Sequence, residues 1–268
     1  MADGAFDRDR FAAALGAVPM GTPLELREAT DSTNDDAWAA LAAGGPDGLA
    51  VVALDQRRGR GRAGRTWTQA PGLGLALSIG LRLGAEARSA GAIPLAAGLA
   101  IADVLATLGV APRLKWPNDV LVNGRKVAGV LCEMRRLPSG DAVVAGLGVN
   151  VAQRAEDFPP GLREAATSLA REGVAARLDD VAEAVCTAFA GRIAQLRAGD
   201  RATVLAAWSE RAAFWGEPVT VRGPASDMTG VAQRLDDSGA LVLRLESGAE
   251  WTAVAGDLVP GAAAAETR

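Results

Sequence analysis

The chain has 268 residues, a formal net charge of −4 and a hydrophobic share of 49%. This length can hold one good-sized core with a small appendage, and the composition is that of an ordinary globular protein. Because the chain is acidic, we exclude a broad nucleic-acid-binding surface and expect any basic site to be local. The absence of histidine excludes the Ser-His and Cys-His nucleophile systems and the commonest zinc ligand.

The N-terminal segment MADGAFDRDRF has no apolar run after a basic segment, so we expect no secretory signal. A short helix is expected at Asp7–Leu15, followed by a linker. A second helix is predicted to begin at the capping sequence STN that starts at Ser32, with acids in its first turn, and to end at Gly44. The sequence LAVVAL, Leu49–Leu54, predicts a buried strand.

The next segment, DQRRGRGRAGRTW, is named here the arginine loop (Asp55–Trp67) and contains five arginines. Glycines let backbone N–H groups close around an anion, and guanidinium groups suit phosphate and carboxylate. Its spacing matches neither a P-loop nor a dinucleotide-binding turn. It can be an RNA-binding segment, a solvated loop without a role or a phosphate-binding loop of another kind; its position between two strands favours the last. Because like charges repel, we expect it to be mobile until an anion binds.

After this loop, GLGLALSIGLR predicts a strand whose leucines and isoleucine face the core. Its other face carries only Gly74, Ala76, Ser78 and Gly80, so a helix or a ligand must approach the backbone closely. The stretch Ile93–Val110 is interrupted by Asp103 and is too short and too polar to span a bilayer. We expect a buried helix at residues 95–108.

The sequence RLKWPNDVLVNGRKVAGVL contains the only two lysines of the chain, Lys115 and Lys126. Two retained lysines among so many arginines indicate sites that prefer a compact ammonium, although chance is an alternative. The dipeptide that starts at Asn123 predicts a type I′ hairpin turn, which can place Lys126 across the sheet from Asp119. An exposed hairpin lysine is the alternative.

Pro117 excludes a continuing helix and predicts an extended stretch before the next strand. Asn118 and Asp119 then lie at the mouth of that strand, either as an Asx turn or as functional groups. The two cysteines, Cys132 and Cys186, lie far apart and are expected to be buried thiols of a cytoplasmic protein.

A further strand is predicted at Ala142–Val151, where GLGVNV permits close backbone approach. Helices are predicted at Leu178–Leu196 and Ala202–Phe214. From Gly216 the chain changes to short strands joined by DSG and ESG turns. We therefore predict an α/β (α+β) domain over residues 1–214, a small β domain over 215–260 and a disordered tail over 261–268.

The segments STN, GRGRAGRTW, KWPNDVLVNGRKVAGVL and GLGVN, at these separations, resemble the catalytic domain of biotin protein ligases, over roughly Ala29–Pro260. The resemblance implies a mixed sheet of the class II aminoacyl-tRNA synthetase and biotin ligase type, followed by an SH3-like barrel. It also implies two reactions. Biotin and MgATP give biotinyl-5′-adenylate and pyrophosphate; a lysine of a biotin carboxyl carrier domain of acyl-CoA or pyruvate carboxylases then accepts the biotin and AMP leaves.

The resemblance also implies roles for individual residues. Lys126 neutralises the biotin carboxylate and the α-phosphate, Arg62 retains the adenylate, and Asp119 is our hypothesis for the group that orients or deprotonates the acceptor lysine, with Mg²⁺ near it. The implied biotin-binding residues are Ser32, Thr33, Asn34, Gln56, Gly59, Arg60, Gly61, Lys126, Gly146 and Gly148. The implied ATP- or adenylate-binding residues are Arg60, Arg62, Arg65, Trp67, Lys115, Asn118, Asp119 and Asn150.

About 28 residues precede the resembling region, too few for a helix-turn-helix domain, so we expect no DNA binding, and no membrane association either. Three alternatives have other sequence requirements. A lipoate or octanoate ligase would show a GGG-A-x-H-type segment, which this chain without histidine cannot supply. A binding regulator without turnover would not need Asp119, and a nucleic-acid-binding RG segment would not be expected between two strands.

Overall fold

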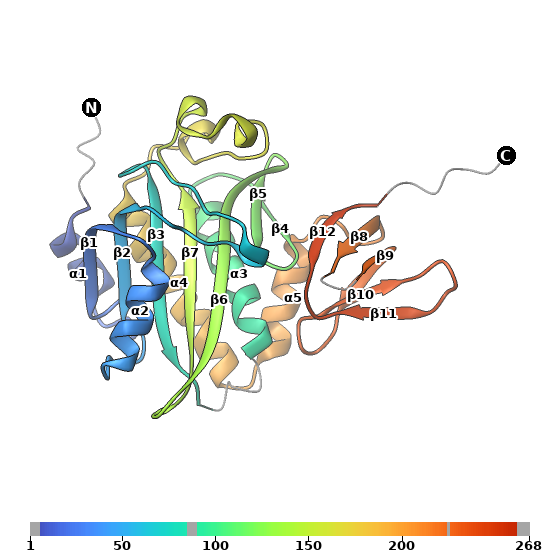
Figure 1. Cartoon of the computed structure of the whole chain (residues 1–268), viewed down its shortest axis with the longest axis horizontal. Coiled ribbons are helices and arrows are strands. Elements are labelled where there is room, and N and C mark those ends of the chain that lie inside the picture. Colours follow the sequence, from blue (N-terminus) through green and yellow to red (C-terminus); the bar gives the residue numbers. More distant parts are fainter. Residues whose placement is uncertain (1–5, 85–89, 224–225, 262–268) are drawn as a thin grey trace.

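A seven-stranded mixed sheet forms the centre of the larger part of the chain in the computed structural model, which describes residues 6–84, 90–223 and 226–261 (Figure 1). The strand order is β1-β2-β3-β7-β6-β5-β4. The first two strands are parallel and the other neighbours are antiparallel. The strands are β1 (Leu24–Thr30), β2 (Ala50–Gln56), β3 (Gly74–Arg82), β4 (Pro112–Lys115), β5 (Asp119–Val122), β6 (Arg125–Leu137) and β7 (Gly140–Asn150).

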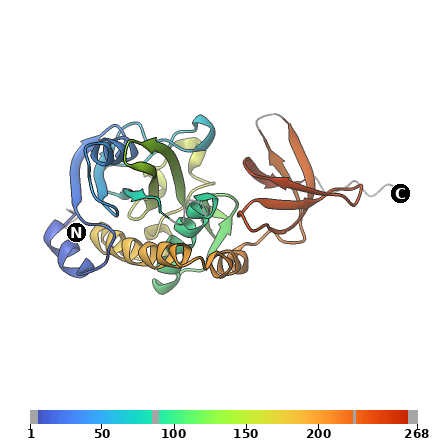
Figure 2. The ribbon, with the colours of Figure 1, turned by 90° about the horizontal axis from the view of Figure 1, so that it is seen from below.

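Helices cover both faces of this sheet, with the larger core on one side (Figures 1 and 2). On that side lie α1 (Arg8–Leu15), α3 (Ile93–Thr107), α4 (Leu178–Arg197) and α5 (Arg201–Arg211). The apolar residues of α3 and α4 form one continuous buried cluster with the strands, because nearly every side chain of α3 is apolar. On the other face, α2 (Thr33–Ala42) buries Trp38 and Leu41 in a second, smaller cluster.

The face of β3 that has small side chains is shared between a helix and an open cleft. A Cβ at Gly80 would lie 3.0 Å from Leu41 Cγ of α2, so this glycine lets the helix approach the strand. Ala76, farther along the same face, lines the cleft described below. The helix alternative is therefore confirmed at the Gly80 end of the strand, and the approach of a ligand at the other end stays a prediction.

Two details of the hairpins decide where polar groups lie. The predicted type I′ turn is confirmed, with positive φ values of 50° at Asn123 and 74° at Gly124. The extended stretch expected at Pro117 is wrong. Lys115 pairs with Asp119 in the β4–β5 ladder, so residues 116–118 form a tight turn that contains a cis Trp116–Pro117 bond.

Other expected elements lie within a few residues of their predicted positions, except that α5 ends at Arg211 and not at Phe214. The edge strands β1 and β4 carried no prediction. Nor did the segment between β7 and α4, which we name the cap (residues 152–172) and which crosses one end of the sheet (Figure 1). The cap is built on short 3-10 turns, η3 (Ala155–Asp157), η4 (Pro160–Leu162) and η5 (Ala170–Glu172).

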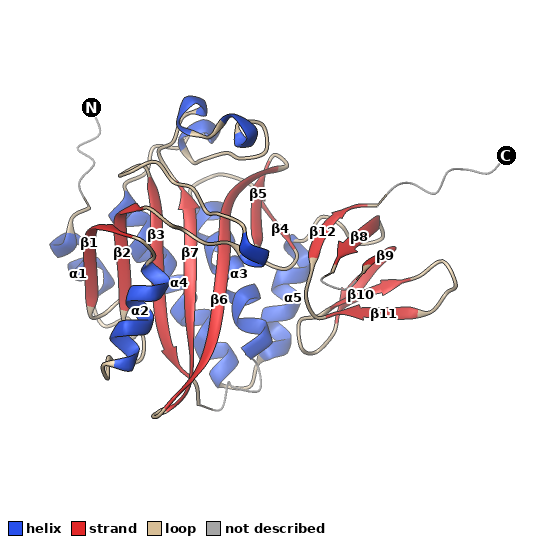
Figure 3. Cartoon of the chain, in the orientation of Figure 1, coloured by secondary structure: helices blue, strands red, loops and turns tan. Residues whose placement is uncertain are grey.

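The predicted small β domain is confirmed as a five-stranded antiparallel sheet in the order β11-β10-β9-β8-β12 (Figure 3). It lies beside α5 and β4, and Trp116 Nε1 donates a hydrogen bond to the Gly239 carbonyl across this junction (3.1 Å). The boundary at residue 214 stays a prediction, and residues 262–268 of the expected tail lie outside the described residues. The strands are β8 (Pro218–Arg222), β9 (Asp227–Leu235), β10 (Leu241–Arg244), β11 (Glu250–Ala253) and β12 (Asp257–Pro260).

One stretch of the described chain, Ala90–Thr107, has the length and apolarity that a membrane span needs. It consists of α3 and the turn before it, and 67% of it is buried inside the protein, as in the core helix of a globular fold. Cys186 is buried and Cys132 is partly buried, both as free thiols; burial raises the pKa of each to about 12.

Candidate functional site

A cleft of about 280 Å³ lies above the middle of the sheet, between the arginine loop and the cap. The end of β2, the start of α2 and the centres of β3, β6 and β7 form its floor and walls. It gathers nearly all of the predicted site residues, from segments far apart in the sequence. Those that line it are Ser32, Thr33, Asn34, Gln56, Arg60, Gly61, Arg62, Arg65, Trp67, Asn118, Asp119, Lys126, Gly146, Gly148 and Asn150.

Two predicted residues do not line this cleft. Gly59 lies behind Gln56, and a Cβ there would be 2.7 Å from Gln56 Nε2. Lys115 lines a smaller cavity of about 120 Å³, which shares Asn118 and Asp119 with the cleft and reaches Arg222 of the small domain. Lys115 can therefore contact only the part of a ligand that extends from the cleft into this second cavity.

Lys126 and Asp119 form an ion pair at the centre of the cleft, with Nζ 2.5 Å from Oδ1. A register shift between Val120 and Leu121 brings the two side chains together across β5 and β6. Both are partly accessible, with 34% of the lysine side chain and 20% of the aspartate exposed. The ammonium also lies 5.7 Å from the centre of the Trp67 ring. The end of the lysine side chain passes over Gly129, where a Cβ would lie 3.0 Å from Nζ.

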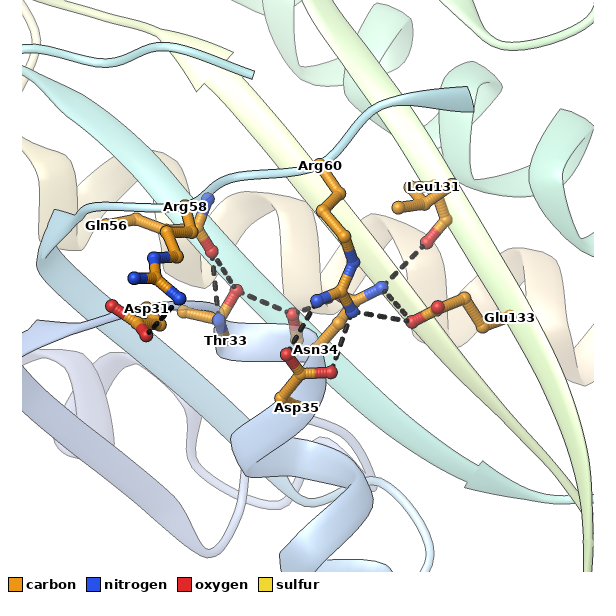
Figure 4. A network of polar contacts seen from close by, with 10 residues as sticks. Asp31, Thr33, Asn34, Asp35, Gln56, Arg58, Arg60, Leu131 and Glu133 are labelled. Carbon is orange, nitrogen blue, oxygen red and sulfur yellow. Dashed lines mark hydrogen bonds and ion pairs between the residues drawn. The ribbon is translucent and has the colours of Figure 1, made fainter. Parts of the chain in front are cut away.

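A chain of hydrogen bonds fixes the side chains at one end of the cleft, where β2 ends and α2 begins (Figure 4). Gln56 Oε1 accepts from the Thr33 backbone N–H at 2.9 Å. Within the described chain the amide nitrogen of Gln56 has no hydrogen-bond partner, so two N–H donors remain available to a ligand. The fully buried hydroxyl of Ser78 lies 2.7 Å from both Thr33 Oγ1 and Asn34 Oδ1. The sequence did not assign this role to Ser78.

Asn34, predicted to bind biotin, has its hydrogen-bonding groups occupied by the protein. Its Nδ2 donates to Glu133 Oε2 at 2.9 Å and to the Leu131 carbonyl at 3.3 Å, and its Oδ1 accepts from Ser78. The amide fits because Gly146 has no side chain to occupy its place. Asn34 therefore shapes the floor of the cleft and leaves ligand recognition to neighbouring groups such as Gln56.

Four of the five arginines in the arginine loop pair with carboxylates of the protein. Arg60 makes a bidentate pair with Asp35 at 2.6 and 2.7 Å, and Arg65 contacts Asp257 of the small domain at 2.6 Å. The outer pairs are Arg57–Asp55 at 3.3 Å and Arg58–Asp31 at 3.7 Å.

Arg62 differs from these four: in the described part of the chain its guanidinium makes no ion pair. Burial lowers the pKa of Arg62, an effect opposed by the charges of Asp257 and Asp119, and an arginine stays charged at neutral pH. Its charge is therefore available to an anionic ligand.

The Asp35–Arg60 pair holds the arginine loop against α2. The hydrogen bond from Arg60 lowers the pKa of Asp35, so the stabilising contribution of the pair is complete above the ordinary pKa of an aspartate and is lost as the pH falls through the lowered value. The loop itself closes through hydrogen bonds from Gly61 N to the Arg65 carbonyl and from Trp67 N to the Gly59 carbonyl. The predicted mobility of the unliganded loop stays a prediction.

Trp67 lies against β6 and β7, where Gly148 makes room for its indole. A Cβ at Gly148 would lie 2.5 Å from the Trp67 ring. The contact predicted between Gly148 and biotin stays a prediction; among the described residues, the Trp67 ring lies nearest to a Cβ at this glycine. Asn150 likewise serves the fold: its Nδ2 donates to the Thr167 carbonyl of the cap at 2.9 Å.

The cap supplies the apolar wall that sequence reasoning missed. Phe158, Leu162, Ala165 and Ala166 line the cleft, and no periodic pattern marks this irregular segment. The cap also clamps the backbone of Lys126. The Lys126 N–H donates to the Ala165 carbonyl (2.8 Å), and the Lys126 carbonyl accepts from the Thr167 N–H (2.9 Å).

Asp119 is the one carboxylate among the described residues that line the cleft. The described chain contains no group of three or more metal-ligating side chains. A dedicated metal cage is therefore absent from this part of the protein. A single carboxylate fits Mg²⁺ that arrives with substrate phosphates, since Mg²⁺ keeps several waters and takes few protein ligands.

Comparisons with known proteins identify the family of the chain. Residues 26–150 match the Biotin/lipoate A/B protein ligase family, and residues 214–258 match the Biotin protein ligase C terminal domain. The chain is 39% identical over 225 residues to a biotin–[acetyl-CoA-carboxylase] ligase of Paracoccus denitrificans, covering 82% of this chain and 93% of that protein. It is 36% identical over 253 residues to the ligase of the same name from Mycobacterium tuberculosis, covering 91% of each.

A solved structure, the biotin protein ligase from Aquifex aeolicus in complex with biotin and ATP, has a TM-score of 0.76 to this fold. The two sequences are 26% identical, and the match covers 89% of this chain and 98% of the Aquifex chain. The fold and the lysine-centred cleft define a ligase of the biotin and lipoate class. Within that class, the chain belongs to the biotin protein ligase family.

We expect Gly148→Ala to abolish ligand binding in the cleft and to leave the protein folded, because the new methyl group would displace Trp67. Gly191→Ala is the matched control: it lies in α4, has nothing within 4 Å of the new Cβ, and should stabilise the protein by about 0.5–1 kcal/mol. Ligand affinity by calorimetry and the midpoint of thermal unfolding check both. Unchanged ligand affinity in Gly148→Ala would show that binding does not depend on the observed position of the Trp67 ring.

Proposed function

We propose that this protein is an ATP-dependent biotin–[acetyl-CoA-carboxylase] ligase that forms biotinyl-5′-adenylate and transfers biotin to a lysine of a biotin carboxyl carrier domain. The observation that carries the proposal is one cleft that combines the Lys126–Asp119 pair, the Nε2 donors of Gln56 and an Arg62 that makes no ion pair with the described residues. The names of the Paracoccus and Mycobacterium relatives and the biotin and ATP in the Aquifex structure support it.

The two ends of the cleft suit the two substrates. At one end, the Gln56 amide donors and the hydroxyl of Ser32 offer neutral hydrogen bonds to a ureido ring. At the other end, Asn118, Trp67 and the apolar side chains of the cap suit a nucleoside. Lys126 lies between them, where the carboxylate of biotin and the α-phosphate of ATP would meet.

The first reaction needs no general base, because a carboxylate is already ionised at neutral pH. Its difficulty is the repulsion between the carboxylate and the triphosphate, which fixed cations relieve. The ammonium of Lys126 has three donors and can contact the carboxylate, the phosphate and Asp119 together. Mg²⁺, when bound with the phosphates near Asp119, would neutralise further negative charge. Arg62, without a carboxylate partner in the described chain, would hold the phosphate of the adenylate.

The second reaction needs the acceptor lysine in its neutral form, although its pKa is about 10.4 in water. Asp119 is the group proposed to orient or deprotonate that amine, since it is the only carboxylate among the described lining residues. We propose a carrier domain of acetyl-CoA carboxylase as the acceptor, extended to other acyl-CoA and pyruvate carboxylases, and a cytoplasmic location. No DNA or membrane partner is part of this proposal.

ATP–pyrophosphate exchange tests the first reaction. We expect exchange with biotin and not with lipoate or octanoate, and a loss of about 10²-fold or more in Lys126→Ala because a charge at the reacting centre is removed. No exchange with any of the three acids would contradict the proposed activity and favour a regulator that binds without turnover.

Single turnover from isolated enzyme–adenylate complexes separates the roles of Arg62 and Asp119. Arg62→Ala should release the adenylate at least about tenfold faster, since a charge-assisted contact is lost. Asp119→Asn should retain the adenylate and transfer it slowly to a carrier domain. Arg58→Ala, whose side chain is 81% exposed, is the control and should behave as the wild type. Retention unchanged in Arg62→Ala, or unimpaired transfer in Asp119→Asn, would remove the corresponding role.

A further inference from the structure

A buried carboxylate of the cap, Glu172, lies outside the cleft and yet contacts residues on both sides of Lys126, in the hairpin and in the cap. Its side chain is 6% exposed. Oε1 accepts from Arg125 Nη2 at 2.8 Å and from Thr167 Oγ1 at 2.5 Å, and Oε2 accepts from Asn123 Nδ2 at 2.7 Å. Both oxygens therefore have donors supplied by three different residues.

The three donors flank Lys126 in a way that fixes its backbone. Asn123 belongs to the turn before β6, and Arg125 is the residue immediately before the lysine. Thr167 donates its backbone N–H to the Lys126 carbonyl, and the neighbouring Ala165 carbonyl accepts from the Lys126 N–H. Glu172 thus joins the hairpin turn and the cap into one unit, with Lys126 held between them.

We propose that Glu172 is a positioning residue for adenylation, which acts through Lys126 by holding the β5–β6 hairpin and the cap in register. The inference rests on the proposed function, in which the Lys126 ammonium meets both substrates. A small movement of this backbone would move Nζ away from Asp119 and Gly129, and a misplacement of about 1 Å in a reacting group can cost about 10²-fold in rate.

The ionised form of Glu172 is the one that suits three donors. Burial alone would raise the pKa of this carboxyl, but the hydrogen bonds from Thr167 and Asn123 and the charge of Arg125 lower it below its usual value. A carboxamide of the same size keeps one acceptor oxygen, replaces the other with an NH₂ group and carries no charge. Glu172→Gln therefore removes one acceptor and the charge-assisted contacts without creating a cavity.

The experiment compares Glu172→Gln with Glu164→Gln, an exposed carboxylate of the same cap. Amide hydrogen exchange in the free protein is the first measurement. The Lys126 and Thr167 amides should exchange about tenfold faster in Glu172→Gln, because the charge-assisted network that holds them is weakened. Their exchange rates should be unchanged in Glu164→Gln.

Pyrophosphate exchange in a double-mutant cycle is the second measurement. Glu172→Gln should lower kcat about tenfold and leave the KM for biotin within about twofold. In the Lys126→Ala background it should lower kcat by less than about twofold, because its effect passes through the lysine. An equal loss in both backgrounds, or a wild-type kcat despite faster amide exchange, would overturn the proposal. If the wild type shows no exchange with biotin, the proposed function fails, and unchanged amide exchange in Glu172→Gln would independently overturn the positioning role.

Discussion

The ion pair between Lys126 and Asp119 is the interaction on which the rest of the site depends. Two unit charges about 4 Å apart attract by about 1 kcal/mol in water and about 4 kcal/mol at an effective dielectric constant of 20, so the half-enclosed cleft strengthens every contact of this lysine. The partner carboxylate keeps the ammonium in place before substrates bind. The hairpin turn, the register shift in β5–β6 and the cap all serve to fix the position of this pair.

The arginine loop shows how an acidic protein handles a dense local positive charge. Arg60 and Arg65 pair with Asp35 on α2 and Asp257 in the small domain, so the loop is tied to both parts of the molecule (Figure 4 shows the first pair). These pairs are half exposed and individually contribute little to stability. Their effect is to orient the loop and to leave the charge of Arg62 for a ligand.

Features with a local cause could be predicted from the sequence. The hairpin turn follows from its Asn-Gly dipeptide and the small-residue face of β3 from alternation. The start of α2 was predicted at Ser32, which is the N-cap residue although its side chain makes no cap hydrogen bond. The set of cleft residues came from the resemblance of the motifs. Contacts between distant residues could not be predicted: Arg65 meets Asp257 across 192 positions, and Glu172 meets Asn123 across 49. The conformation of the cap and the hydrogen bonds of the Asn34 and Asn150 amides depend on such long-range contacts, which leave no local pattern in the sequence.

The central claim is that Lys126 receives the substrate carboxylate, and the presence of only two lysines allows a direct test. With ¹⁵N-labelled lysine, the protein has two side-chain ammonium resonances, which Lys126→Arg assigns, and Lys115 serves as the internal control. We predict that biotin added without ATP shifts the Lys126 resonance and leaves that of Lys115 in place. A Lys126 resonance unmoved by saturating biotin would contradict the account.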